Sequence, residues 1–239
     1  MTISDDSNNV FPLGGTALVI GAAGGIGAAL LQKLSQRTEF ANVVGVSRHS
    51  DPAVDITDED SIARAAAQFV GTDLRLIIIA TGLLAGQGIA PEKSLRDING
   101  DALARSFLVN TIGPALLLKH FLPLLPRAGK SVCAMLSARV GSISDNRLGG
   151  WYGYRASKSA LNQVMRTASV EIARSRPEAI CVALHPGTVA TPLSAPFAKS
   201  GLDLQSPDEA ASRLLSVIHG LGPADNGQFF DHMGEAISY

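Results

Sequence analysis

The stretch that most constrains the fold is a glycine-rich turn near the start of the chain, Gly21-Ala22-Ala23-Gly24-Gly25-Ile26-Gly27. A β-branched, apolar run (Thr16–Ile20) precedes it and a helical pattern (Ala28–Gln36) follows it. Glycines let the backbone approach a ligand closely, and a helix N-terminus offers free N–H groups to a pyrophosphate. The spacing G-x-x-x-G-x-G is not the commoner G-x-G-x-x-G, so the turn alone leaves a purely structural glycine turn as an equal alternative.

The rest of the chain alternates predicted strands with predicted helices. Leu74–Ala80 is almost continuously apolar, as expected of a central parallel strand covered on both faces. Further strands are predicted at Asn42–Val46, Ser131–Leu136, Ala179–Leu184 and Gln228–Phe230, and helices at Glu59–Val70, Asp101–Leu125, from Gly149 towards Pro177, and at Pro207–Ile218. Right-handed crossovers between such units build an α/β fold, a Rossmann-type doubly wound parallel sheet with helices on both faces.

We expect one domain over residues 11–239, because no linker or short repeat interrupts them, and a disordered tail over residues 1–10. The net charge of −1 gives no electrostatic basis for binding nucleic acid or an anionic membrane. Cys133 and Cys181 lie in apolar runs and are interpreted as buried small hydrophobes, not as metal ligands or a disulfide.

Neither a signal peptide nor a membrane span is expected. The polar start lacks a basic-then-apolar pattern, and the richest apolar run, Ala115–Leu125, is broken by Lys119, His120 and Pro123. These features predict a cytoplasmic protein.

Tyr154 and Lys158 form the first candidate catalytic pair. Helical spacing of the apolar residues after them places the two side chains one turn apart on one face. An ammonium within roughly 4–6 Å favours the phenolate, so Lys158 is expected to lower the tyrosine pKa from its usual value of about 10. A lone Y-x-x-x-K is more often a surface tyrosine beside a solvated lysine, so this interpretation depends on the remaining motifs.

Asn110 is the second candidate. Pro114 lies inside the Asp101–Leu125 pattern and cannot donate a hydrogen bond to the carbonyl four residues earlier, which belongs to Asn110. The sequence therefore predicts a kink with a freed carbonyl at Asn110, able to hold a water. The alternative is an ordinary kink with Asn110 on the surface.

The end of the second strand carries Ser47 and Arg48 and no acidic residue. An acidic residue here would bind a ribose 2′-hydroxyl, whereas an arginine accommodates a 2′-phosphate. We therefore expect NADP(H) in preference to NAD(H), with a solvated loop cation as the alternative for Arg48. Asp55 and Ile56 are candidates to meet the adenine, although capping of the helix Glu59–Val70 is the favoured role of Asp55.

Other candidates follow two further strands. Thr81 and Gly82 follow Ala80, and Pro186–Thr191 closes the strand that begins at Ala179. In open α/β sheets ligands bind at the carboxyl ends of the strands. His185 lies between a strand and Pro-Gly, and packing is favoured over catalysis for a lone histidine there.

Together these motifs resemble the short-chain dehydrogenase/reductase family from Thr16 onward. Two local segments are similar to the C-factor-like and sniffer-like carbonyl reductase branch. They are Ser-Ala-Arg-Val-Gly-Ser-Ile and, further along, Gly-Gly-Trp-Tyr-Gly-Tyr-Arg-Ala-Ser-Lys. The resemblance implies that Tyr154 is the general acid while NADPH delivers hydride, that Lys158 lowers the pKa of Tyr154 and binds ribose hydroxyls, and that Asn110 holds a water. The implied cofactor-binding set is Gly21, Gly24, Gly25, Ile26, Gly27, Ser47, Arg48, Asp55, Ile56, Ala80, Thr81, Gly82, Asn110, Tyr154, Lys158, Pro186, Gly187, Val189 and Thr191.

The chain departs from the family pattern in two places. The usual Asn-Asn-Ala-Gly is here Ile79-Ala80-Thr81-Gly82. The family's catalytic serine is normally the second of Ser-Ser-x-x-Gly, and an ungapped match places Ala138 there. Ser137 is the candidate if the strand end is shifted by one residue, and Ser142 is a further one. A missing donor to the developing oxyanion would cost on the order of 10²–10³ in rate.

Two functions are consistent with the sequence. The first is an NADPH-dependent carbonyl reductase or alcohol dehydrogenase acting on a small or medium, fairly apolar compound, since Thr191–Ser206 is short and mostly apolar (Leu193, Pro196, Phe197 and Leu202). The second is an NADP(H)-binding regulatory or signalling protein with little turnover, suggested by Ala138 and the C-factor resemblance. The family resemblance also suggests a homodimer or homotetramer packed through the Tyr154 helix and its neighbour.

Overall fold

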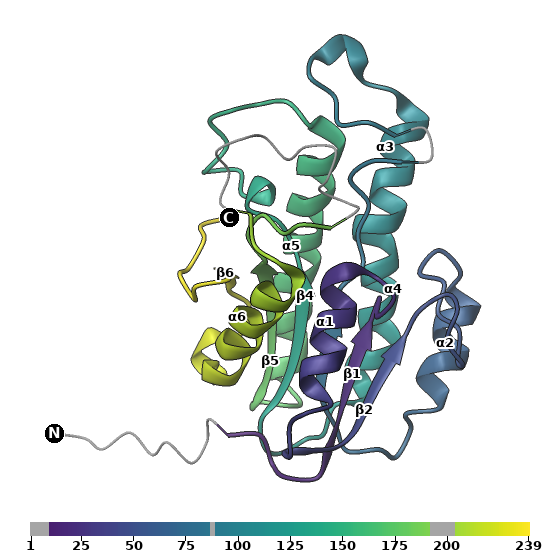
Figure 1. Ribbon diagram of the computed structural model, residues 1–239, viewed down its shortest axis with the longest axis vertical. Helices are drawn as coiled ribbons and strands as arrows, with labels where there is room; N and C mark the ends of the chain where they lie inside the picture. The colour runs from purple at the N-terminus through teal and green to yellow at the C-terminus, as the bar shows by residue number, and fades with distance from the viewer. Residues whose placement is uncertain (1–9, 87–88, 192–203) are drawn as a thin grey trace, which may run out of the picture.

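The computed structural model describes residues 10–86, 89–191 and 204–239, and within them the chain forms a six-stranded parallel sheet (Figure 1). Its strand order is β2-β1-β3-β4-β5-β6. The strands are β1 (Gly15–Ile20), β2 (Phe40–Val46), β3 (Leu74–Ile79), β4 (Ser131–Leu136), β5 (Ala179–His185) and β6 (Phe229–Asp231).

Helices cover both faces of this sheet. One face packs against α1 (Gly25–Leu34) and α6 (Pro207–Gly220), the other against α2 (Glu59–Ala67), α4 (Gly113–Phe121) and α5 (Tyr152–Ala173). The side chains of β1 alternate accordingly, because successive residues of a strand point to opposite faces. Leu18 and Ile20 join the core beneath α2, α4 and α5, whereas Ala17 and Val19 join the core beneath α1 and α6. The predicted doubly wound α/β fold is confirmed.

The predicted strands agree with the observed ones to within two residues, but the prediction for Asp55 as a helix cap is wrong. α2 begins one residue after Asp58, whose side chain accepts a hydrogen bond from the backbone N–H of Asp60. Asp55 instead accepts hydrogen bonds from the backbone N–H and hydroxyl of Thr57, at 2.9 and 2.7 Å. A carboxylate three residues closer to the helix supplies the cap.

Pro114 produces a π-helical turn. The helix α3 (Gly100–Phe107) passes into π geometry over Leu108–Ile112 before α4 begins. A proline removes one N–H from the helical ladder, and a wider turn is one way to accommodate that loss. The predicted irregularity is therefore present at Asn110, which is fully buried, so the surface alternative for this residue is excluded.

The helical stretch Gly100–Leu124 is more apolar than the sequence runs suggested. With a mean hydropathy of 1.3 over its most apolar window, it is long and apolar enough to cross a membrane by length and composition. Core packing explains much of this apolar character, because Leu117, Leu118 and Phe121 are buried beneath the sheet.

The order in which the strands are added reverses at β1. β1 lies between β2 and β3, and the connection that leaves β2 crosses β1 to reach β3 on its other side. Such a switch point leaves a crevice at the carboxyl ends of the strands, where open α/β sheets bind ligands. Of the sequence predictions, the tail at residues 1–9 and the apolar residues of the segment 192–203 lie outside the described residues.

Candidate functional site

A cleft of about 560 Å³ occupies this switch point. It is bounded by the carboxyl ends of β1, β2 and β3 and by the helical stretch that contains Arg105 and Val109. The predicted nucleotide-binding residues that line it are Gly21, Gly24, Ser47, Arg48, Asp55, Ile56, Ala80, Thr81 and Gly82.

The glycine turn is closed tightly onto the first turn of α1. Gly21 has a φ of +90°, and a Cβ built on Gly27 would lie 2.2 Å from the carbonyl oxygen of Gly21. Only glycine fits at position 27. The helix has no side-chain cap at Gly24 and no acidic residue in its first turn. Its N-terminal N–H groups and positive dipole end are therefore suited to an anion.

The loop Pro186–Thr191 meets the glycine turn from the other side. A Cβ on Gly25 would lie 2.9 Å from the Thr191 methyl carbon, so these two predicted cofactor segments are in contact. Gln205, which the sequence did not indicate, holds the loop. Its backbone N–H donates to the Thr188 carbonyl at 2.9 Å, and its side-chain amide donates to the Pro186 carbonyl at 3.2 Å.

The pKa of Asp55 is lowered by hydrogen bonds and by two nearby arginines. Hydrogen bonds from the backbone and side chain of Thr57 lower the pKa of Asp55, and the nearby charges of Arg48 and Arg105 lower it further. Arg105 lines the same cleft as Arg48 and was missed in the sequence. Arg105 could have been found from its helical spacing to Val109, which places the two residues on one face of the helix.

Asn110 ties the end of β3 to α5. Its Oδ1 accepts from the backbone N–H of Leu83, and its Nδ2 donates to the Leu83 carbonyl, both at 2.8 Å. The same Nδ2 donates to the hydroxyl of Ser157 at 3.1 Å. The amide of Asn110 thus fixes two segments that border the cleft.

Lys158 reaches the same place from α5. A Cβ built on Gly82 would be 3.7 Å from both the Lys158 Nζ and the Asn110 Oδ1, so the two side chains converge there. Lys158 is only 3% exposed, and its Nζ donates to the carbonyl of Leu136 at 2.9 Å. Burial lowers the pKa of Lys158 to about 8.

Tyr154 lies one turn before Lys158, with its ring centroid 5.9 Å from the Lys158 Nζ. The expectation that the lysine would lower the pKa of Tyr154 is not met in this structure, since burial raises that pKa to about 12. The ammonium approaches the ring and donates to Leu136, so desolvation of the phenol outweighs its influence.

The two candidate serines both donate to other groups of the chain. Ser137 is buried and its hydroxyl donates to the Asn162 Oδ1 at 2.6 Å. Ser142 donates to the carbonyl of Ser238 at 2.5 Å. Ala138, in extended conformation two residues after the end of β4, has no side-chain donor. The role of Ser137 therefore stays a prediction, and it would require exchanging Asn162 for a substrate oxygen.

His185 and the cysteines lie in packed surroundings. Burial lowers the pKa of His185 to about 4, so the ring is neutral near pH 7, and it lies edge-on to His232 with 6.3 Å between centroids. Cys133 and Cys181 are buried, unbridged and paired in register on β4 and β5.

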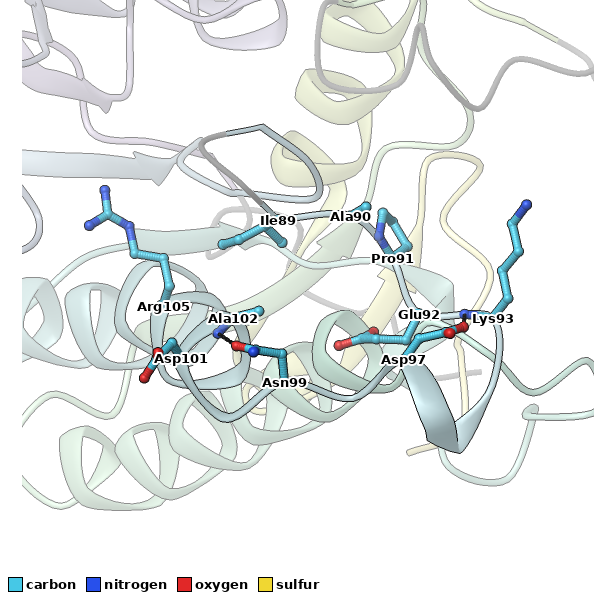
Figure 2. Close-up of a pocket in the computed structure, with 10 residues that line it drawn as sticks. All are labelled: Ile89, Ala90, Pro91, Glu92, Lys93, Asp97, Asn99, Asp101, Ala102 and Arg105. Carbon is cyan, nitrogen blue, oxygen red and sulfur yellow. Dashed lines mark hydrogen bonds between the residues drawn. The ribbon is translucent and has the colours of Figure 1, made fainter.

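A second cavity, of about 740 Å³, is lined by the residues drawn in Figure 2. It shares Arg105 with the first cleft. Its walls are the segment 89–93 and the N-terminal part of α3. Glu92 on this wall is only 7% exposed, which is unusual for a carboxylate.

Comparison with known proteins identifies the family. The family model described as short chain dehydrogenase matches residues 15–200, and the chain belongs to this family. The C-signal protein of Myxococcus xanthus is 37% identical over 147 residues, which are 61% of this chain and 84% of that protein. A 1-hydroxy-2-glutathionyl-2-methyl-3-butene dehydrogenase of Rhodococcus sp. is 29% identical over 90% of this chain and 95% of its own.

Solved structures agree with the fold. An NADPH-bound carbonyl reductase from chicken fatty liver superposes with a TM-score of 0.81, at 25% identity and with 96% of each chain covered. The carbonyl reductase Sniffer of D. melanogaster, at 22% identity, has a TM-score of 0.79 and covers 95% of this chain and 100% of its own. The family model and the similarity to the C-signal protein confirm the resemblance to the short-chain dehydrogenase/reductase family, and Sniffer shares its fold. The chain is an oxidoreductase by family.

Proposed function

We propose that the protein is an NADP(H)-dependent oxidoreductase that interconverts a carbonyl compound and an alcohol. The observation that carries this proposal is the convergence of Asn110 and Lys158 on Gly82, with the Tyr154 ring 5.9 Å from the Lys158 Nζ. Three elements far apart in the sequence, the end of β3, the π-helical turn and α5, bring these groups together.

The residues of the cleft fit a dinucleotide. The uncapped N-terminus of α1 suits a pyrophosphate, and Arg48 with Arg105 suits the 2′-phosphate that distinguishes NADP(H). The Thr81 hydroxyl is buried without a hydrogen-bond partner in the described part of the chain, and it lines the cleft where a ligand would offer one. A bound nicotinamide supplies the hydride.

Tyr154 is the proposed proton donor. With a pKa of about 12 its phenol is protonated near neutral pH, so it carries the proton that a carbonyl oxygen would accept. Lys158 is proposed to bind the ribose hydroxyls, and Asn110 to hold the end of β3 against α5 and to order a water on the path to Lys158. The substrate proposed is a small or medium apolar carbonyl compound, in keeping with the chicken carbonyl reductase.

The second candidate function is regulatory binding of NADP(H) with little turnover. It is favoured by Ala138, which leaves the usual serine position without a donor, and by the similarity to the C-signal protein. Against it stands the complete set of Asn110, Tyr154 and Lys158, which a nucleotide sensor does not need.

Purified protein incubated with NADPH and a panel of ketones, aldehydes and quinones separates the two functions. Consumption of NADPH, followed by its absorbance, supports the reductase, whereas tight NADPH binding without turnover supports the regulatory function. Turnover with NADH alone would contradict the proposed role of Arg48.

We also propose a homo-oligomer packed through α4 and α5. A groove lies between these helices, and its lining includes the apolar side chains of Leu118, Val164 and Ala168.

A further inference from the structure

The chain enters the helix that carries Tyr154 through an unusual backbone. Gly149, Gly150 and Trp151 all have positive φ, at 63°, 65° and 54°. A non-glycine residue in this region costs on the order of 1 kcal/mol or more, and such a residue persists only where its surroundings hold it. Trp151 is the N-cap of α5, yet it provides no side-chain cap, and the first turn contains no acidic residue.

Glu92, from a distant part of the chain, supplies the carboxylate cap that the N-terminus of α5 lacks locally. Its backbone carbonyl accepts from the Trp151 N–H at 2.5 Å, and its Oε2 accepts from the Gly153 N–H at 3.1 Å. The contact with Gly153 joins positions 61 residues apart, and the carboxylate is buried on the wall of the cavity in Figure 2. A buried anion at a helix N-terminus is stabilised by the backbone N–H groups and by the helix dipole.

The fit around this carboxylate is close. A Cβ built on Gly153 would lie 2.8 Å from the Glu92 Oε1, so a side chain at this position would push the carboxylate away. The Trp151 ring lies edge-on to the Tyr154 ring, with 6.2 Å between centroids. Tyr154 directly follows Gly153, so the Glu92 contacts fix the turn from which the phenol projects.

We propose that Glu92 is a positioning residue that holds Tyr154 in its reactive orientation through Trp151 and Gly153. The effect on turnover rests on the proposed function, whereas the effect on the geometry of α5 does not. Misplacing a reacting group by about 1 Å can lower a rate by about 10²-fold, so a small movement of this turn should be measurable.

The test compares Glu92→Ala and Glu92→Gln with Glu178→Ala. Glu178 is a matched control, since its carboxylate also accepts a glycine N–H, that of Gly129, at 2.8 Å on the amino side of the sheet. Trp151 is the only tryptophan in the sequence, so its fluorescence reports on this turn directly.

In Glu92→Ala we expect red-shifted Trp151 emission, stronger quenching by acrylamide and a kcat at least about tenfold lower, with the NADPH Kd changed less than about threefold. Glu92→Gln should stay within about threefold of wild type in kcat, because its amide oxygen still accepts from Gly153. Should Glu92→Ala fail to fold, Gly153→Ala is the second variant, and it should reproduce the same loss of kcat and the same emission shift.

Wild-type emission together with a kcat within about twofold of wild type in Glu92→Ala would overturn the proposal, as would equal effects of Glu178→Ala. If wild-type protein turns over no carbonyl compound, the proposed function fails on its own, and Trp151 emission together with hydrogen exchange at the Gly153 amide still decides the role of Glu92.

Discussion

The Nζ of Lys158 lies 5.9 Å from the centroid of the Tyr154 ring, and burial moves the pKa values of the two groups in opposite directions. The pKa of Lys158 falls to about 8, and the pKa of Tyr154 rises to about 12. Lys158 therefore loses its proton more readily than Tyr154. In the proposed reduction this order would let the lysine help restore the proton that the tyrosine gives away.

The lowered pKa of Lys158 predicts how stability depends on pH. Between pH 8 and 10.5 the unfolded chain binds more protons at this group than the folded one, so the unfolding free energy rises with pH across this window. The unfolding free energy of wild type should rise across this window by up to roughly 3 kcal/mol more than that of Lys158→Met, which lacks the ammonium. Urea denaturation at pH 7.5 and pH 10 measures it.

Lys130, whose pKa burial also lowers to about 8, is present in both proteins and cancels in this comparison. Identical pH dependence in wild type and Lys158→Met would contradict the buried position of Lys158.

Gly27→Ala should disable the glycine turn. The added methyl would lie 2.2 Å from the Gly21 carbonyl oxygen, so the turn must move. We expect a loss of roughly 1–3 kcal/mol in unfolding free energy and at least about tenfold weaker NADPH binding, measured by nucleotide fluorescence. Gly100→Ala is the control, since a Cβ there meets no atom within 4 Å, and it should change neither quantity noticeably.

Arg48→Ala should weaken NADPH binding by about 10- to 100-fold and leave NADH binding nearly unchanged, because the arginine is proposed to pair with the 2′-phosphate. Arg64→Ala, which removes an exposed arginine on α2, should alter neither affinity. Titrations with both nucleotides measure the ratio. Equal losses of affinity for NADPH and NADH in Arg48→Ala would show that Arg48 does not bind the 2′-phosphate.

Ala138→Ser and Ser137→Ala separate the possible donors to the substrate oxygen. We expect Ala138→Ser to raise turnover by about tenfold or more, because it restores a hydroxyl at the family position. Ser137→Ala should lower stability by about 1 kcal/mol through loss of the hydrogen bond to Asn162. A change in kcat of less than about threefold would exclude Ser137 as the donor. A hundredfold loss of kcat in Ser137→Ala would instead make Ser137 the donor.

Much of the fold could be predicted from local pattern. β4 was predicted with its observed bounds, and the glycine turn was placed correctly after β1. Its last three residues, Gly25–Gly27, form the start of α1, which the prediction began at Ala28. Short apolar runs indicate where the strands lie, and proline positions indicate where a helix is interrupted. Both signals can be recognised within a few residues of sequence. Element ends were less certain, since a cap depends on one side chain: Asp58, not Asp55, caps α2.

The parts of the site that were missed depend on contacts across the fold. Glu92 meets α5 from 61 residues away, and Gln205 meets the Pro186–Thr191 loop through two backbone hydrogen bonds and one from its side chain. No local motif requires either residue. The pKa of Tyr154 was likewise not predictable, because it depends on how deeply the phenol is buried and on where the Lys158 ammonium points.

The most direct measurement of the central claim is NADPH consumption by wild type and Tyr154→Phe on the best carbonyl substrate of the panel. The account predicts that Tyr154→Phe loses about 10²–10⁴ in kcat, because the phenol is the proton donor, while the NADPH Kd stays within about threefold of wild type. Undiminished turnover in Tyr154→Phe would contradict it, since the proton would then come from another group.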